Sequence, residues 1–177
     1  YELYIRQDYA AHVYETLWAA GQAHGIANAG YRAIDTLRLE KGYLYWSTDI
    51  GPDYNPYEAG LGFAVALDKG DFIGREAALA ERESGGTLRR ICLKVEAVDA
   101  DVIGDEPIWH GDQVVGWITS GGYGHHVGAS LAQGYVPKAL ADDTTAGAFK
   151  IEILGVLHAA TVLTEPLFDP DGARMRA

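Results

Sequence analysis

Six short β runs in the second half of the sequence constrain the fold more than any other feature. They are separated by turn signals such as HGDQ and DDTTAG, and no helical periodicity lies between them. The runs cover residues 87–96, 107–110, 113–119, 131–137, 149–154 and 157–163. Gly111 and Asp112 connect two of them, which is a strong hairpin signal. Evenly spaced strands without helices predict a small antiparallel barrel.

The first half of the sequence mixes helical and extended patterns, which indicates an α+β layer. In chain order it predicts a strand over 2–6, a helix over 9–25 capped by Asp8 and packed on a sheet, a helix over 31–41 stopped by Gly42, a buried strand over 63–67 and a helix over 74–83. The run SGG at 84–86 then predicts a boundary between two domains, residues 1–86 and 87–177. The tail FDPDGARMRA is expected to be solvated and frayed.

Charge and composition exclude several classes of function. A formal net charge of −11 disfavours nucleic acid as a partner, because polyanions are normally met by clustered Lys and Arg. The single cysteine, Cys92, excludes an intrachain disulfide, and we interpret it as a buried structural thiol. No run reaches the roughly 18 apolar residues of a membrane span, and no signal peptide is seen. We therefore expect a cytoplasmic or mitochondrial-matrix protein without a membrane partner.

Aromatic residues gather around the second predicted helix. Tyr31 lies at its start, and Tyr43, Tyr45 and Trp46 follow Gly42. Four large rings supply more flat apolar surface than a helix end needs, so a planar ligand is one interpretation and a core contact the other. The loop STDIGPDYNPYEAG comes next, and long loops in compact domains are often functional.

Three strings carry a resemblance to a known family. YRAIDTLRLEKGY, NPYEAGLGFAVALDKGDFIGREA and ITSGGYGHHVGASLAQGYV resemble the folate-dependent aminomethyltransferases typified by the glycine-cleavage T-protein. GGYGHHVG and LDKGDFIGREA look most like flavin-dependent dimethylglycine and sarcosine dehydrogenases. The resemblance covers nearly the whole chain but only the latter part of the family domain. It implies a folate-binding α+β body followed by a C-terminal barrel.

The resemblance also implies an activity. It is the capture of a one-carbon unit from a methylated amine or aminomethyl donor as 5,10-methylene-tetrahydrofolate, by a portion of a dimethylglycine or sarcosine dehydrogenase-like enzyme. The alternatives are a T-protein proper, a folate-dependent demethylase and a non-catalytic folate-binding module. The implied cofactor is tetrahydrofolate, with FAD only through an upstream domain. The family's catalytic Asp lies upstream of the matching strings, so we expect the chain to be a processed product or fragment that is inactive alone.

Two charged residues are candidate folate contacts. Glu2 alternates out of the first predicted strand, where a carboxylate usually meets water, but it falls at the family position that accepts hydrogen bonds from the pterin's donor edge. Arg32 lies in the string that matches the family's folate-contacting arginine, and its planar fork suits a ligand carboxylate. Arg38, in the same string, is interpreted as a member of a structural ion pair.

Four aromatic residues complete the predicted folate site. Tyr31, Trp46 and Phe63 are candidate folate contacts, although Trp46 and Phe63 considered alone favour a core position over a pocket wall. Tyr123 lies in the GGYGHHVG stretch that borders the folate domain in the family. The glycines of that stretch predict a tight turn. A metal site at His125 and His126 is not expected, since no third ligand lies at a diagnostic spacing.

Overall fold

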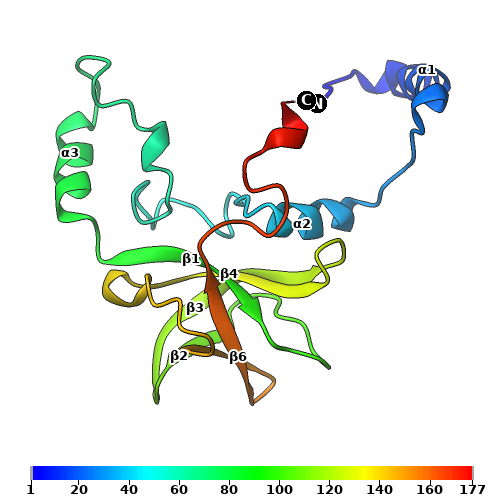
Figure 1. Cartoon of the computed structure of the whole chain (residues 1–177). Helices are drawn as coiled ribbons and strands as arrows, with labels where there is room; N and C mark the ends of the chain where they lie inside the picture. The colour runs from blue at the N-terminus through cyan, green and yellow to red at the C-terminus, as the bar shows by residue number, and fades with distance from the viewer. Residues whose placement is uncertain (1, 177) are drawn as a thin grey trace. The chain divides into compact units, whose positions relative to one another are not determined.

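The computed structural model describes residues 2–176 and divides into two compact units, which meet in the sequence between Ala33 and Ile34 (Figure 1). Helix α2, Tyr31–Glu40, runs across this division. The boundary predicted at Gly86 remains a prediction.

The first unit is built from short helices. Helix α1 is Ala10–Gly21, flanked by the 3₁₀ turns η1, Gln7–Tyr9, and η2, Gln22–His24. Gly25 ends this segment with φ 70°, as predicted, because glycine alone reaches the left-handed region without steric cost. None of the α1 residues is buried within the described chain.

Two predictions for the first unit are wrong. Residues 2–6 form no strand, since the part of this unit that the structure describes contains no second strand to pair with them. Asp8 does not cap α1. It lies inside η1 and forms an ion pair with Arg6 at 3.0 Å, while Tyr9 occupies the cap position without a side-chain bond.

The second unit contains a closed antiparallel barrel, which confirms the fold class predicted from the sequence (Figure 1). Its six strands follow one another around the barrel in the order β1-β4-β3-β2-β5-β6. They are β1 Leu88–Val95, β2 Pro107–His110, β3 Gln113–Gly124, β4 Ala129–Pro137, β5 Phe149–Ile153 and β6 Val156–Leu163. Gly111 and Asp112 connect β2 to β3, as the hairpin signal predicted.

The barrel encloses the main hydrophobic core. The alternation of the strands turns one set of side chains inward, and this set includes the fully buried residues Leu93, Ile108, Ile118, Phe149 and Ile151. Strand β1 closes the barrel by pairing with both β4 and β6, from Leu88↔Pro137 on one side to Val95↔Ala160 on the other. Closure satisfies the edge hydrogen bonds that an open sheet would expose.

The glycines of GGYG do not form the predicted turn. They continue β3, which pairs with β4 as far as Gly124↔Ala129. A Cβ at Gly121 would lie 2.6 Å from Val102, and one at Gly124 would lie 2.8 Å from Val127. Glycine is therefore required here by close packing rather than by a left-handed backbone. The histidines of the motif lie in the turn after β3.

Helices and an irregular loop precede the barrel within the second unit. Helix α3 is Arg75–Ser84 and ends at Gly85 with φ 75°. The strand predicted over 63–67 is absent: Gly62–Ala64 form the 3₁₀ turn η3, and Val65 is extended without a ladder partner. No helix among the described residues is long and apolar enough to cross a membrane.

The buried carboxylate of Glu58 fastens this loop to the first barrel strand. Its Oε1 accepts hydrogen bonds from the backbone N–H groups of Thr87 and Leu88 at 3.0 and 3.1 Å, and its Oε2 accepts one from Asn55 at 3.4 Å. Burial opposes ionisation, but the amides of Leu88, Thr87 and Asn55 outweigh it and lower the pKa of Glu58. The charged form is thus the one that holds loop and barrel together.

We expect Glu58→Gln to lower the free energy of unfolding by about 1–3 kcal/mol, because the three amide donors lose a charged acceptor and one of the two oxygen positions becomes an N–H donor. Since the folded pKa is depressed below 4.5, the stabilisation in the parent chain is complete above that value and is lost as pH falls through the folded pKa. Urea titrations between pH 3 and 7 measure both effects. Glu83→Gln, at an exposed position of α3, is the control. An equal loss in both variants would contradict the role of Glu58.

Candidate functional site

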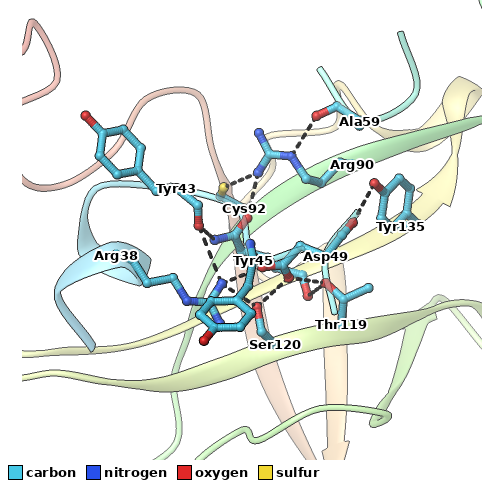
Figure 2. Close-up of polar contacts among 11 residues, drawn as sticks. Arg38, Tyr43, Tyr45, Asp49, Ala59, Arg90, Cys92, Thr119, Ser120 and Tyr135 are labelled. Atoms are coloured by element: carbon cyan, nitrogen blue, oxygen red, sulfur yellow. Dashed lines mark hydrogen bonds and ion pairs between the residues drawn. The ribbon is translucent and has the colours of Figure 1, made fainter. Parts of the chain in front are cut away.

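Asp49 lies at the centre of a polar network on the second unit (Figure 2). Its side chain is fully buried, and its carboxylate accepts hydrogen bonds from Thr119 Oγ1 at 2.6 Å, Ser120 Oγ at 2.5 Å and the backbone N–H of Tyr45 at 2.9 Å. Arg38 supplies the balancing charge through Nη1, 2.5 Å from Oδ2. A buried carboxylate with this many donors is held in one position.

A tight turn brings Asp49 to this place. The backbone N–H groups of Thr48, Asp49 and Ile50 all point at the carbonyl of Tyr45, and Ser47 N–H donates to the carbonyl of Ile50 at 2.8 Å. Ser47 adopts φ 71°, in the left-handed region. The turn therefore folds back on itself and directs the Asp49 side chain toward β3.

Arg38 forms an ion pair with Asp49, which confirms the prediction that it is a member of a structural ion pair. Besides Asp49, its Nη1 reaches Ser120 Oγ at 3.1 Å, and its guanidinium lies 5.3 Å from the Tyr45 ring centroid. Its side chain is 12% exposed. Arg38 thus joins α2 to the Asp49 turn, 11 residues away, and to β3, 82 residues away in the sequence.

A second arginine extends the network along β1 and β4 (Figure 2). Arg90 donates to the carbonyl of Ala59 at 3.0 Å, to Gln133 Oε1 at 2.8 Å and to Cys92 Sγ at 3.1 Å. Gln133 in turn donates to the carbonyl of Tyr43 at 3.0 Å. Cys92 is half-buried rather than buried, and its sulfur serves as a hydrogen-bond acceptor.

The network also includes Tyr135, a buried residue of strand β4. Tyr135 OH donates to the backbone carbonyl of Asp49 at 2.8 Å, and the Tyr54 ring stacks on the Tyr135 ring with centroids 3.8 Å apart. Burial raises the pKa of Tyr135, so this hydroxyl stays protonated and remains a donor.

An apolar cavity also has Arg38 in its lining, and we name it the α2 pocket. It has a volume of about 440 Å³ and lies between α2 and residues 168–174, which we call the C-terminal segment. Ile34, Leu37, Tyr43 and Phe168 give it apolar and aromatic walls. The cationic residues Arg38, Lys41 and Arg174 surround these walls, and Asp169 is the one acidic residue among the lining residues.

The C-terminal segment is fixed to α2, so the prediction of a frayed tail is wrong for its first residues. Phe168 N–H donates to the Glu40 carbonyl at 3.2 Å, and Lys41 Nζ contacts both the carbonyl and the carboxylate of Asp169. Arg174 lies 5.1 Å from the Phe168 ring centroid. The charge of Lys41 is thus balanced within the segment.

A neighbouring cavity of about 540 Å³ shares Tyr43 and Lys41 with the α2 pocket. Its other walls include Leu44, Ile50 and Phe63. The predicted pocket residue Phe63 therefore does line a cavity, although its own side chain is 87% exposed.

The remaining predicted folate contacts lie at the surface of their units. Glu2, Tyr31 and Arg32 belong to the first unit and are exposed. Trp46 and Tyr123 belong to the second unit, 66% and 39% exposed, and the Tyr123 ring packs edge-on against His125. Their assignment to one folate site remains a prediction.

Sequence reasoning missed the residues that organise the site. Asp49 and Phe168 lie in segments without a periodic pattern. Gln133 lies in a strand, and its side chain contacts Arg90 and Tyr43, which are distant in the sequence. A weak signal for Asp49 was an acid in a loop directly after an aromatic run. Among residues 2–176, no group of three or more His, Cys, Asp or Glu side chains is placed to hold a metal ion.

Comparisons with known proteins match both parts of the sequence. The GCVT N-terminal domain matches residues 1–69, and the glycine cleavage T-protein C-terminal barrel domain matches residues 89–169. The chain is 40% identical to sarcosine dehydrogenase and to dimethylglycine dehydrogenase of Mus musculus, both mitochondrial, over 99% of its own length and 20% of theirs. It is 34% identical to the aminomethyltransferase of Moorella thermoacetica over 95% of this chain and 45% of that protein.

A solved structure agrees with these matches. The crystal structure of glycine cleavage system aminomethyltransferase T from Bartonella henselae is similar with a TM-score of 0.79 and 28% identity, over 91% of this chain and 44% of that chain. The chain thus spans about a fifth of the length of the dehydrogenases and less than half of the aminomethyltransferases.

We expect Asp49→Asn to lower the free energy of unfolding by about 3–5 kcal/mol, because it leaves the Arg38 guanidinium buried without its counter-charge. Thr119→Val removes one donor to the same carboxylate and should cost less, about 1.5 kcal/mol. Urea denaturation of both variants at pH 7 measures the difference. Equal losses would show that the charge of Asp49 is not the main contribution.

Proposed function

Because the chain belongs to the glycine cleavage T-protein family, we propose that it is the tetrahydrofolate-binding, aminomethyltransferase-type portion of a dimethylglycine or sarcosine dehydrogenase-like enzyme. Its partner in that role is the rest of the parent polypeptide or enzyme complex, which also supplies FAD and the catalytic Asp expected from the family resemblance. We then expect the 177-residue chain alone to bind tetrahydrofolate but not to catalyse the transfer of the one-carbon unit.

The α2 pocket is the observation that carries this proposal. Folate is a chain of aromatic rings that ends in a glutamyl carboxylate, so a pocket for part of it needs flat apolar walls and a cation at the rim. Tyr43 and Phe168 provide rings, and Ile34 and Leu37 provide apolar surface. The volume of about 440 Å³ suits the benzoyl-glutamate part of the molecule rather than all of it.

The charges around the pocket favour an anion. Asp49 balances Arg38, and Asp169 balances Lys41. Arg174 has no ion pair within residues 2–176, and its guanidinium lies over the Phe168 ring at the pocket wall. One cation of the lining is therefore left to receive a ligand carboxylate, for which a guanidinium is well suited.

In this proposal the protein positions the ligand and excludes water, while tetrahydrofolate, when bound, supplies the amine that accepts the one-carbon unit. The Asp49 network holds α2 against the barrel, so the pocket walls are rigid before the ligand arrives. Glu2, Tyr31, Arg32, Trp46, Phe63 and Tyr123 remain proposed contacts for the pterin and the glutamyl tail in the complete protein.

A T-protein proper is the main alternative, supported by the match to the Moorella aminomethyltransferase. A folate-dependent demethylase and a non-catalytic folate-binding module use the same pocket. Product analysis of the complete protein with tetrahydrofolate and dimethylglycine, sarcosine or an aminomethyl donor separates these functions.

The names of the mouse and human relatives support a mitochondrial location over a cytoplasmic one.

Leu37→Asp tests the α2 pocket. A carboxylate in this apolar wall should repel the glutamyl tail and weaken the binding of 5-formyl-tetrahydrofolate at least tenfold by calorimetry, about 1.4 kcal/mol. Ile73→Asp is the matched control, since Ile73 is fully exposed and lines none of the cavities described above. Unchanged affinity in Leu37→Asp would place the ligand elsewhere. Both variants should keep the melting temperature of the parent chain within a few degrees.

Glu2→Gln tests the proposed pterin contact in the complete protein. Glutamine offers one acceptor and one donor where the carboxylate offers two acceptors, so folate affinity should fall about ten- to a hundredfold, or roughly 1.5–3 kcal/mol. Thermal stability should change little, because Glu2 is exposed. Calorimetric titration measures the affinity. Wild-type affinity would mean that Glu2 is an ordinary surface carboxylate.

A further inference from the structure

A third cavity shares Arg38 with the α2 pocket. It has a volume of about 330 Å³ and is formed where α2, the turn after Tyr45 and strand β3 come together. We name it the Asp35 pocket. Asp35 and Arg38 come from α2, Tyr45 and Thr48 from the turn, and Ser120 from β3.

The charge of this pocket is negative. Asp35 is half-buried, and its carboxylate makes no ion pair or hydrogen bond with another side chain in the described part of the protein. Arg38, three residues further along the helix, is directed to Asp49 at 2.5 Å and is balanced there. One carboxylate charge is therefore uncompensated in a partly enclosed site, which favours a cationic ligand.

The walls of the pocket show which cation fits. Thr48 and Ser120 contribute hydroxyl groups, and the Ser120 hydroxyl is fixed by donating to Asp49 at 2.5 Å while it accepts from Arg38. The Tyr45 ring and the Ile103 side chain contribute apolar surface. One carboxylate and two hydroxyls do not make the set of oxygen ligands that a divalent metal ion requires.

We propose that the Asp35 pocket binds a small alkylammonium ion. The nitrogen donates its hydrogens to the Asp35 carboxylate and to the hydroxyl of Thr48, and the alkyl groups contact Tyr45 and Ile103. A charge-assisted N–H···O⁻ bond in a half-buried site supplies the attraction, and the apolar walls discriminate against a bare inorganic cation. This site shares Arg38 with the α2 pocket but does not depend on folate binding there.

The direct test is a titration of the isotope-labelled 177-residue chain with dimethylammonium chloride, followed by amide chemical shifts. Potassium chloride at matched ionic strength is the reference salt. We expect saturable shifts confined to amides of α2, of the turn at 45–48 and of Ser120 and Gly121. Shifts identical to those in potassium chloride, or saturable shifts confined to other parts of the chain, would overturn the proposal.

Variants establish the role of the carboxylate. Asp35→Asn should weaken the binding of dimethylammonium at least tenfold, and Asp35→Glu, which keeps the charge, should bind within threefold of the parent chain. Asp112→Asn, at the exposed β2–β3 turn, is the control for loss of one negative charge and should leave the affinity unchanged. Equal affinity in Asp35→Asn and the parent chain would refute the site.

A further titration distinguishes two sources of the ammonium group, a free amine and a lysine side chain. A parallel titration with N-acetyl-lysine methylamide presents the same chemistry on a long side chain. Tighter binding of dimethylammonium supports a free amine as ligand, whereas tighter binding of the lysine derivative supports a lysine side chain. Failure of folate binding in the Leu37→Asp experiment would not affect either result, because no folate is present here.

Discussion

The second unit depends on a buried charge, the carboxylate of Asp49. It is fully enclosed, yet it accepts hydrogen bonds from a turn, from two β3 hydroxyls and from an arginine of α2. Taking such a group out of water costs several kcal/mol unless every lone pair is used, so the surrounding segments must adopt one arrangement. The network thereby selects a unique position for α2 against the barrel.

The two cavities beside α2 follow from that position. Arg38 pairs with Asp49, and within residues 2–176 Asp35 is left without a counter-charge, while Ile34 and Leu37 of the same helix line the α2 pocket. A single helix therefore borders two cavities of different character, one apolar with the Arg174 guanidinium at its wall and one with the Asp35 carboxylate, and neither group forms an ion pair within the described residues. The Lys41–Asp169 pair plays a similar part by holding Phe168 at the wall of the α2 pocket.

The barrel supports this arrangement and contributes only β3, through Ser120 and Gly121, to the wall of the Asp35 pocket. Its closure fixes β1, β3 and β4, and these strands carry Arg90, Ser120 and Gln133 to the outer surface where they meet the loop segments. Glycines 121 and 124 allow β3 to approach Val102 and Val127 too closely for any larger side chain. The fold is thus a rigid base, and the segments attached to it create the sites.

The amino-acid sequence by itself determined the barrel, since period-two alternation and turn residues act within a few positions and all six strands lie close to the runs it predicts. It also determined the ends of the helices at Gly25, Gly42 and Gly85, where only glycine adopts the backbone readily. Strands at 2–6 and 63–67 did not form, because neither the alternation of the first nor the apolar run of the second supplies a pairing partner. The Asp49 network and both pockets were decided by tertiary structure, since Arg38, Asp49 and Ser120 become neighbours only when segments up to 82 residues apart pack together.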